Sequence, residues 1–228
     1  MSSTNVLDGI TKFCKDPAWT EPFRALILTH SAAACAEFGL DTDAVPVQLG
    51  PEVYAMFITC ILEDFMTRAD GPDGANVTDA YLKRHAWKLS SSAKRALQTI
   101  RASHMGLYEI VAINQGQGFD LRDLLRGGEI ITVIQPTLSR GLMAGCMLGV
   151  RVVTGEDGAT TVTAGLLPFD ENKDKEAVAY VRAALGAGEE PLTEAQLAEV
   201  APAISNFWLK KTLEETLKQE QAAAADVA

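Results

Sequence analysis

The stretch GLYEIVAINQGQGFDLRDLLRGGEIITV, residues 106–133, decides the fold class of this chain. In LYEIVAI the β-branched residues and their alternation favour a strand, and a turn from Asn114 to Gly118 separates it from a second run, FDLRDLL. Gly127 and Gly128 predict a tight hairpin that leads into a third strand, EIITVIQ. The stretch therefore predicts a short β-unit.

Two more strands are expected after this stretch. The runs CMLGVRVVT and TTVTAGLL alternate on either side of GEDG, which is another hairpin signal. Five or six short strands within roughly 65 residues favour a small antiparallel β-barrel or curled sheet, because such a sheet closes off its own edges. We assign this β-unit to residues 106–170.

Helical patterns lie on both sides of the β-unit. Residues 1–105 contain an aspartate–proline helix start at Asp16, a nearly all-apolar core helix, VYAMFITCILEDFM, and N-cap candidates at Thr78 and Ser90. Residues 171–228 are predicted to form C-terminal helices, one of which begins with the capping box TEAQ. The predicted fold class is therefore α+β, with an N-terminal helical region, a small antiparallel β-barrel or curled sheet, and C-terminal helices.

Composition indicates an ordinary globular protein. The 228 residues carry a formal net charge of -10, which argues against wholesale adhesion to nucleic acid or to an anionic membrane. No apolar run reaches 18 residues and the first residues lack a secretory signal pattern, so we expect neither a membrane span nor secretion. The four cysteines are far apart in apolar surroundings, which predicts reduced, buried thiols in a cytoplasmic protein.

A family resemblance covers the segment from about Glu63 to Pro168. It rests on the order LYEIV, a glycine turn, FDLRDLL, a glycine hairpin, LSR, an apolar strand and GLLPF. The matching residues are Glu109, Leu121, Asp123, Leu124, Leu125, Ser139, Arg140, Arg151 and Gly165. This segment resembles the central domain of uncharacterised bacterial proteins that often carry a C-terminal SEC-C zinc-binding tail. The cysteine- and histidine-rich tail is absent from this sequence, so the resemblance implies a domain type without its zinc site and without a reaction.

No motif in the sequence predicts catalysis, a metal site or a cofactor. The three histidines stand apart from one another and from the cysteines, and His30 is predicted to be a hydrogen-bonded core residue. Glu63 and Asp64 follow an apolar helix and diverge by about 100° around it, so we predict a solvated pair at the helix end. We therefore expect a protein that is not an enzyme and uses no cofactor or metal.

One charged segment departs from the acidic character of the rest. Residues 80–108 contain six basic residues and no acidic ones: Lys83, Arg84, Lys88, Lys94, Arg95 and Arg101. Such a stretch predicts a contact for an acidic partner or nucleic acid, or else a solvated face that neutralises neighbouring acids in the fold. Arg140, which follows Ser139, is a further candidate. It would either bind an anion or brace the β-unit against Asp123, and we favour the brace.

The C-terminal segment offers a second candidate contact. Its large apolar side chains predict a stripe that packs on the body of the protein or on a second copy: Phe207, Trp208, Leu209, Leu213 and Leu217. With the basic stretch, this pattern favours a non-enzymatic cytoplasmic binding module or adaptor that recognises a protein partner. The alternative is a nucleic-acid-associated regulator that uses residues 83–101, and an enzyme of unknown class comes third.

Overall fold

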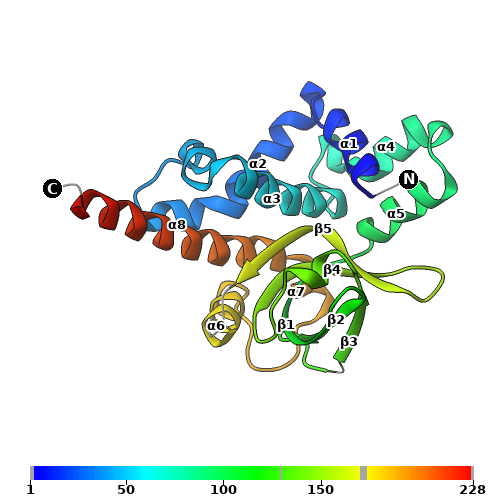
Figure 1. Cartoon of the computed structure of the whole chain (residues 1–228). Coiled ribbons are helices and arrows are strands. Elements are labelled where there is room, and N and C mark those ends of the chain that lie inside the picture. Colours follow the sequence, from blue (N-terminus) through cyan, green and yellow to red (C-terminus); the bar gives the residue numbers. More distant parts are fainter. Residues whose placement is uncertain (1–2, 129, 170–173, 227–228) are drawn as a thin grey trace.

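The computed structural model describes residues 3–128, 130–169 and 174–226 and confirms the α+β fold class (Figure 1). The α-helices described before the sheet are α1 (Ser3–Phe13), α2 (Pro17–Glu37), α3 (Val45–Thr67), α4 (Val77–His85) and α5 (Ser91–Arg101). Those described after it are α6 (Asp174–Ala184), α7 (Glu194–Ala198) and α8 (Val200–Asp226). Short 3₁₀ turns lie at η1 (Thr42–Ala44), η2 (Pro72–Gly74), η3 (Ala86–Lys88) and η4 (Leu138–Arg140).

The strands form one antiparallel sheet in the order β3-β2-β1-β4-β5. They are β1 (Met105–Asn114), β2 (Gly118–Asp123), β3 (Ile130–Ile134), β4 (Met147–Thr154) and β5 (Thr160–Phe169). The first four form a Greek key, because β4 returns to lie beside β1 after the β1-β2-β3 meander. All the strands expected from the sequence are therefore present, in one sheet.

The sheet curls but does not close, so the predicted barrel is wrong and the alternative, a curled sheet, is what forms. Gln135, just after β3, donates from Nε2 to Thr161 Oγ1 of β5 at 3.4 Å, so the two edges approach each other there. No ladder joins β3 to β5 among the described residues. With this strand order the two edge strands run in the same direction, and an all-antiparallel barrel needs an even number of strands.

Local capping chemistry sets most helix starts where the sequence predicts them. The Asp16 and Ser90 side chains accept hydrogen bonds from the first-turn amides of α2 and α5, and Thr193 begins α7 with a capping box. The prediction for Thr78 is wrong, because Asn76 caps α4 instead. The Thr78 hydroxyl is buried and donates to a carbonyl at the end of α3, so the residue ties two helices together.

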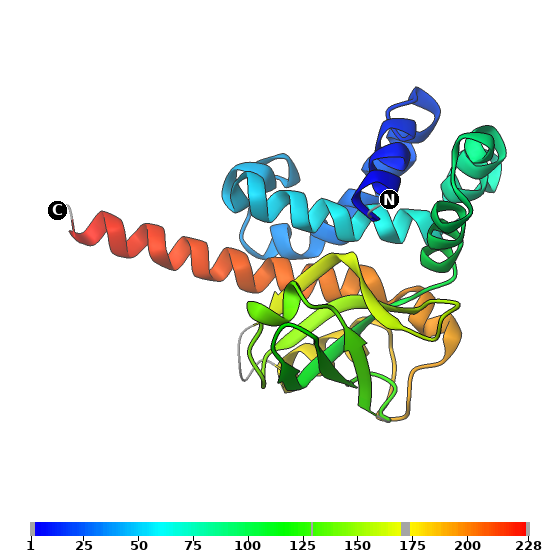
Figure 2. The ribbon, with the colours of Figure 1, turned by 45° about the vertical axis from the view of Figure 1, so that its right-hand side comes forward.

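The core has two parts that meet along the sheet. The larger part joins the helices to one side of the sheet and includes Phe57, Phe65, Leu97 and Phe207, all fully buried. The smaller part fills the inside of the curl: Tyr108, Ile110, Phe119, Leu121, Val133, Leu148, Val150 and Val162. Figures 1 and 2 show α8 running between the N-terminal helices and the sheet and then extending beyond the body of the protein.

One described segment, Thr42–Thr67, is long and apolar enough by length and composition to cross a membrane, although no uninterrupted apolar run in the sequence reaches 18 residues. It contains α3, which packs against α2, α8 and β5 and buries Phe57, Ile61 and Phe65 in the core. A core helix meets the same length and hydropathy requirement, so the segment is weak support for a membrane span. None of the four cysteines forms a disulfide with another, and three of them are buried.

Candidate binding groove

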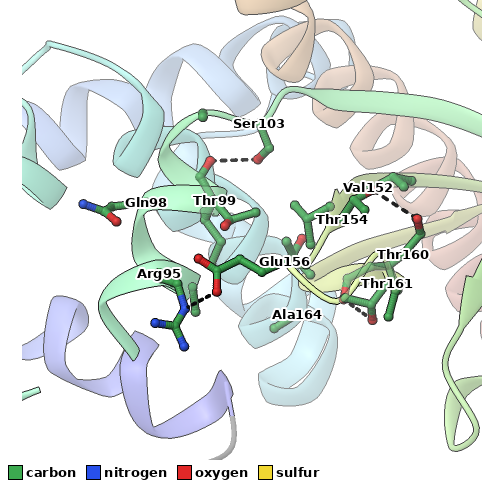
Figure 3. Close-up of a pocket in the computed structure, with 18 of the residues that line it drawn as sticks. Arg95, Gln98, Thr99, Ser103, Val152, Thr154, Glu156, Thr160, Thr161 and Ala164 are labelled. Atoms are coloured by element: carbon green, nitrogen blue, oxygen red, sulfur yellow. Dashed lines mark hydrogen bonds and ion pairs between the residues drawn. The ribbon is translucent and has the colours of Figure 1, made fainter. Parts of the chain in front are cut away.

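A groove lies between α5 and the β4–β5 hairpin and has a volume of about 1230 Å³ (Figure 3). Helix α5 forms one wall with Arg95, Gln98 and Thr99, and the hairpin forms the other. The hairpin wall consists of residues 152–157 and 159–164, and Ile134 and Gln135 at the end of β3 close one side. The lining combines apolar side chains with hydroxyl and amide groups, which can orient a polar chain by hydrogen bonds.

The α5 wall follows from the amphipathic pattern of that helix. Ala93, Leu97 and Ile100 are buried in the core, so the residues between them turn towards the groove and solvent. The hairpin wall follows from the alternation of β5, in which Val162 enters the inner core and Thr161 does not. Both patterns are visible in the sequence, but their opposition across a groove is a tertiary property.

An ion pair bridges the groove. Arg95 Nε on α5 lies 3.1 Å from Glu156 Oε2 in the β4–β5 turn, and Figure 3 shows the two side chains reaching towards each other. The side chains are 48% and 76% exposed, so water competes with the pair and its contribution to stability is small. A ligand that offers either group a better partner can therefore separate the two walls at little cost.

Glu63 of α3 lies at the floor of the groove and is 1% exposed. Its carboxylate accepts hydrogen bonds from Thr163 Oγ1 at 2.6 Å and from the Gly165 amide at 2.9 Å. These contacts hold the irregularity where β5 departs from its register with β4. A Cβ at position 165 would lie 2.9 Å from the Cα of Cys60, so only glycine permits this approach of strand to helix.

Glu63 and Asp64 are both buried, so the prediction of a solvated pair at the helix end is wrong. Asp64 Oδ1 accepts from Arg151 Nη2 of β4 at 2.7 Å, and its other oxygen lies 3.2 Å from His30 Nε2. The predicted divergence of the two side chains is correct, and it directs each to a different strand. One turn of α3 therefore fastens both β4 and β5, and the sequence gives no local signal of partners so distant.

The pKa values of the two buried acids shift in opposite directions. Burial raises the pKa of Glu63, and the hydrogen bonds from Thr163 and Gly165 offset only part of the rise. Burial would also raise the pKa of Asp64, but the hydrogen bond to His30 and the charges of Arg151, His30 and Arg68 together hold that pKa below its usual value. The surroundings of Asp64 therefore stabilise its charged form, whereas burial disfavours the charged form of Glu63.

His30 is confirmed as a hydrogen-bonded core residue, and its partners form a serine–histidine–aspartate line. Ser205 Oγ lies 2.9 Å from His30 Nδ1, and Asp64 lies on the other side of the ring. These residues are 0%, 0% and 1% exposed in the order Ser205, His30, Asp64. A nucleophile needs access to a substrate carbonyl, which this sealed arrangement does not give. The line therefore joins α2, α3 and α8 as a structural network.

Half of the basic stretch is neutralised within the fold. Arg84 lies 3.9 Å from Asp16, Arg95 pairs with Glu156, and Arg101 makes a bidentate contact with Asp79. The three lysines have no acidic partner among the described residues: Lys83, Lys88 and Lys94. Lys88 lies 4.7 Å above the ring of Trp87, which is 78% exposed. The arginines of the stretch therefore form ion pairs within the fold, whereas Lys83, Lys88 and Trp87 form an exposed tip.

Arg140 does not brace the β-unit against Asp123, so that prediction is wrong. Asp123 Oδ2 accepts from Arg126 Nε at 2.8 Å, and its Oδ1 accepts the amides of residues 125 and 126. Arg140 is exposed, whereas Ser139 is buried and accepts from the Gly116 amide at 3.0 Å. Asp123 is therefore paired with Arg126, three residues further along the chain, and not with Arg140.

The C-terminal stripe lies mostly inside the protein's own core. Phe207, Trp208, Leu209 and Leu213 are buried, and Trp208 stacks on Phe57 with ring centroids 5.7 Å apart. Leu217 is partly exposed, one turn further along α8. The stripe therefore packs on the body, and little of it is left for a second copy.

Comparison with known proteins yields one family and no relative. The model of a family of unknown function, DUF7986, matches residues 59–184, which is more than half of the chain. No curated protein and no solved structure matches the chain. The matched region contains α5, the whole sheet and the end of α3, so both walls and the floor of the groove lie within it. None of these comparisons connects the chain with the SEC-C-associated proteins.

Proposed function

The chain belongs to this family of unknown function, and from the site that the family region builds we propose a non-enzymatic binding module that recognises a protein partner. The groove between α5 and the β4–β5 hairpin is the proposed recognition site. The observation that carries the proposal is that the family region supplies a groove of about 1230 Å³ lined by hydroxyl and amide groups. Such groups orient a ligand by directed hydrogen bonds.

The chemistry around the groove favours binding over catalysis. Glu63 has a raised pKa, which is a feature of many acid–base sites, but its carboxylate is already occupied by Thr163 and Gly165. The serine–histidine–aspartate line ends inside the core and opens into neither groove nor solvent. A partner that lies along the groove uses the exposed hydroxyl and amide groups and requires none of these buried ones.

The charges at the groove favour a protein over nucleic acid. The charged groups of its lining are Glu63, Glu156 and Asp157 against Arg95, so the lining is acidic overall. A polyphosphate chain would meet repulsion there, and Arg95 is already paired. The tip formed by Lys83, Lys88 and Trp87 lies outside the groove and is the part of the basic stretch on which the nucleic-acid alternative depends.

A site-directed photo-cross-linker tests the proposed site. We place p-benzoylphenylalanine at Gln98, an exposed position on the groove wall, and in a matched protein at Ala183, an exposed position on α6 away from the groove. Irradiation in living cells is expected to give a discrete cross-linked protein from position 98 and none from position 183. Nuclease treatment of the extract should leave the cross-link unchanged, because the partner is a protein.

A blocking variant provides the control for the cross-linking experiment. Ala164→Trp introduces an aromatic side chain at an exposed position of the groove, and it is expected to abolish the cross-link from Gln98. Identical cross-links from positions 98 and 183 would contradict the proposal, as would a cross-link that survives the blocking variant. A product that disappears with nuclease would favour the nucleic-acid alternative.

A further inference from the structure

The edge strand β5 has one side without a strand partner, and the hydrogen-bond pattern shows which backbone groups face that side. The Gly155 amide donates to the Ala159 carbonyl at 2.8 Å, and the register pairs Thr154 with Thr160 and Val153 with Thr161. Hydrogen-bonded and non-hydrogen-bonded pairs alternate along an antiparallel ladder. The backbone groups of Thr161 therefore face β4, and those of Thr160 and Val162 face away from it.

The protein itself covers two positions in the second half of this edge, Gly165 and Pro168. The Gly165 amide donates to the carboxylate of Glu63. Pro168 has no amide hydrogen, and its carbonyl accepts from Trp208 Nε1 at 2.8 Å. Uncovered edge strands attract other chains, and proteins commonly cover them or place proline on them. In its second half β5 therefore shows both of these protections, a cover at Gly165 and a proline at Pro168.

The first half of the edge has no backbone partner among the described residues, and it lies in the groove beside the end of β3, from which Gln135 reaches the Thr161 hydroxyl. Among the described residues, the outward amides of Thr160 and Val162 have no backbone partner, and the Val162 carbonyl receives only the Thr161 hydroxyl at 3.5 Å. Thr160, Thr161 and Val162 all line the groove. The groove therefore coincides with the part of the β5 edge to which the fold supplies no backbone hydrogen bond.

We propose that an extended segment of the protein partner adds as a strand to β5 at Thr160 and Val162, and this inference rests on the proposed function. The open edge presents alternating amide hydrogens and carbonyl oxygens, and an extended polypeptide carries the complementary groups at the same spacing. Glu156 and Asp157 stand at the turn end of the edge, so a segment with a basic side chain at that end fits best. Glu63, which holds residue 165, marks the other end of the open edge.

A peptide library and an ester scan test the mode of binding. A phage library of random linear dodecapeptides is selected on the full protein, and the tightest peptide is resynthesised with single backbone amides replaced by esters, which removes one hydrogen-bond donor at a time. Strand addition predicts losses of about tenfold at alternate positions and little change between them, because only every second residue of an added strand faces β5. A uniform profile would overturn the proposal.

A proline substitution tests the same contact from the protein side. Thr160→Pro removes the outward amide hydrogen, which edge strands tolerate, whereas Thr160→Val removes only the hydroxyl that bonds Thr154. The proline variant is expected to weaken the peptide about tenfold or more, and the valine variant to bind within about twofold of the wild type. Equal affinities in the two variants would overturn strand addition. Should the proline variant not fold, amide hydrogen exchange of Thr160 and Val162 with and without peptide replaces it, and unchanged exchange rates overturn the proposal.

The outcomes separate this inference from the proposed function on which it rests. If peptides fail to bind the Ala164→Trp variant but show a uniform ester profile, the groove remains the binding site and strand addition is overturned. If the peptides still bind the Ala164→Trp variant, both the groove as the site and strand addition are overturned. A protein that dimerises in the wild type but not as Thr160→Pro would identify the occupant as a second copy and would overturn the assignment to a separate partner.

Discussion

The buried pair of Asp64 and Arg151 gives the sharpest prediction of stability. The two charged atoms are 2.7 Å apart, and both side chains are 2% exposed. Asp64→Asn removes the negative charge and leaves the guanidinium of Arg151 in the core, with the Ser103 carbonyl as a neutral partner. Breaking a buried ion pair in this way costs about 3–5 kcal/mol. Against a typical unfolding free energy of about 5–15 kcal/mol, such a loss is large.

The measurement is a double-mutant cycle by urea unfolding. Asp64→Asn and Arg151→Met are expected to lower the unfolding free energy separately, and each kcal/mol corresponds to about 2–4 °C in Tm for a chain of this size. The double variant is expected to cost less than the sum of the two by about 0.5–3 kcal/mol, because it leaves no uncompensated charge. Additive losses, or a loss below about 1 kcal/mol for Asp64→Asn, would refute the reasoning.

Four further outcomes follow from contacts in the protein. As pH falls from 7 towards about 4.5, the stability advantage of the wild type over Glu63→Gln should grow, because the folded state takes up a proton at the raised pKa of Glu63 before the unfolded state does. Below about pH 4, the stability advantage of the wild type over Asp64→Asn should shrink, because the pKa of Asp64 is lowered in the folded state. Urea unfolding midpoints of the three proteins across this pH range test both trends. Trp208→Phe keeps the aromatic ring but leaves a strand carbonyl without its donor, so we expect a loss of about 1–3 kcal/mol, and an unchanged unfolding curve would contradict the contact. The double variant Lys94→Glu, Arg95→Glu should change the unfolding free energy by about 1 kcal/mol or less and should bind a basic peptide in the groove more tightly. Weaker peptide binding would point to an acidic partner. Lower stability with unchanged peptide binding would point to a face that only neutralises the protein's own acids.

Features that depend on neighbouring residues could be predicted from the sequence. The alternation and glycine turns of residues 105–169 place every strand, and the Asp16 and Ser90 caps fix two helix starts. Glu63 and Asp64 were misplaced because their partners lie 87 to 102 residues further along the chain. A helix-end polar pair has the same local pattern whether it meets water or a strand.

The groove could not be predicted for the same reason. Its α5 wall and its hairpin wall are separated by about 60 residues, and neither wall has a composition that marks a site. The basic stretch attracted attention because charge is visible in a sequence, whereas ion pairing is not. Arg101, for example, is neutralised by Asp79, which lies 22 residues earlier and one helix away.

The position of α8 in the core has a consequence for synthesis of the protein on the ribosome. Of the described elements α8 emerges last, yet its Ser205 and Asn206 are partners of His30 and Ala34, 175 and 172 residues earlier. At about 5–20 residues per second, translation of the intervening chain takes roughly 9–35 s. Throughout that interval the nascent α2 lacks the residues that complete its buried face. The N-terminal helices therefore remain exposed to proteases and chaperones until α8 has been translated, and the core is complete only from that point.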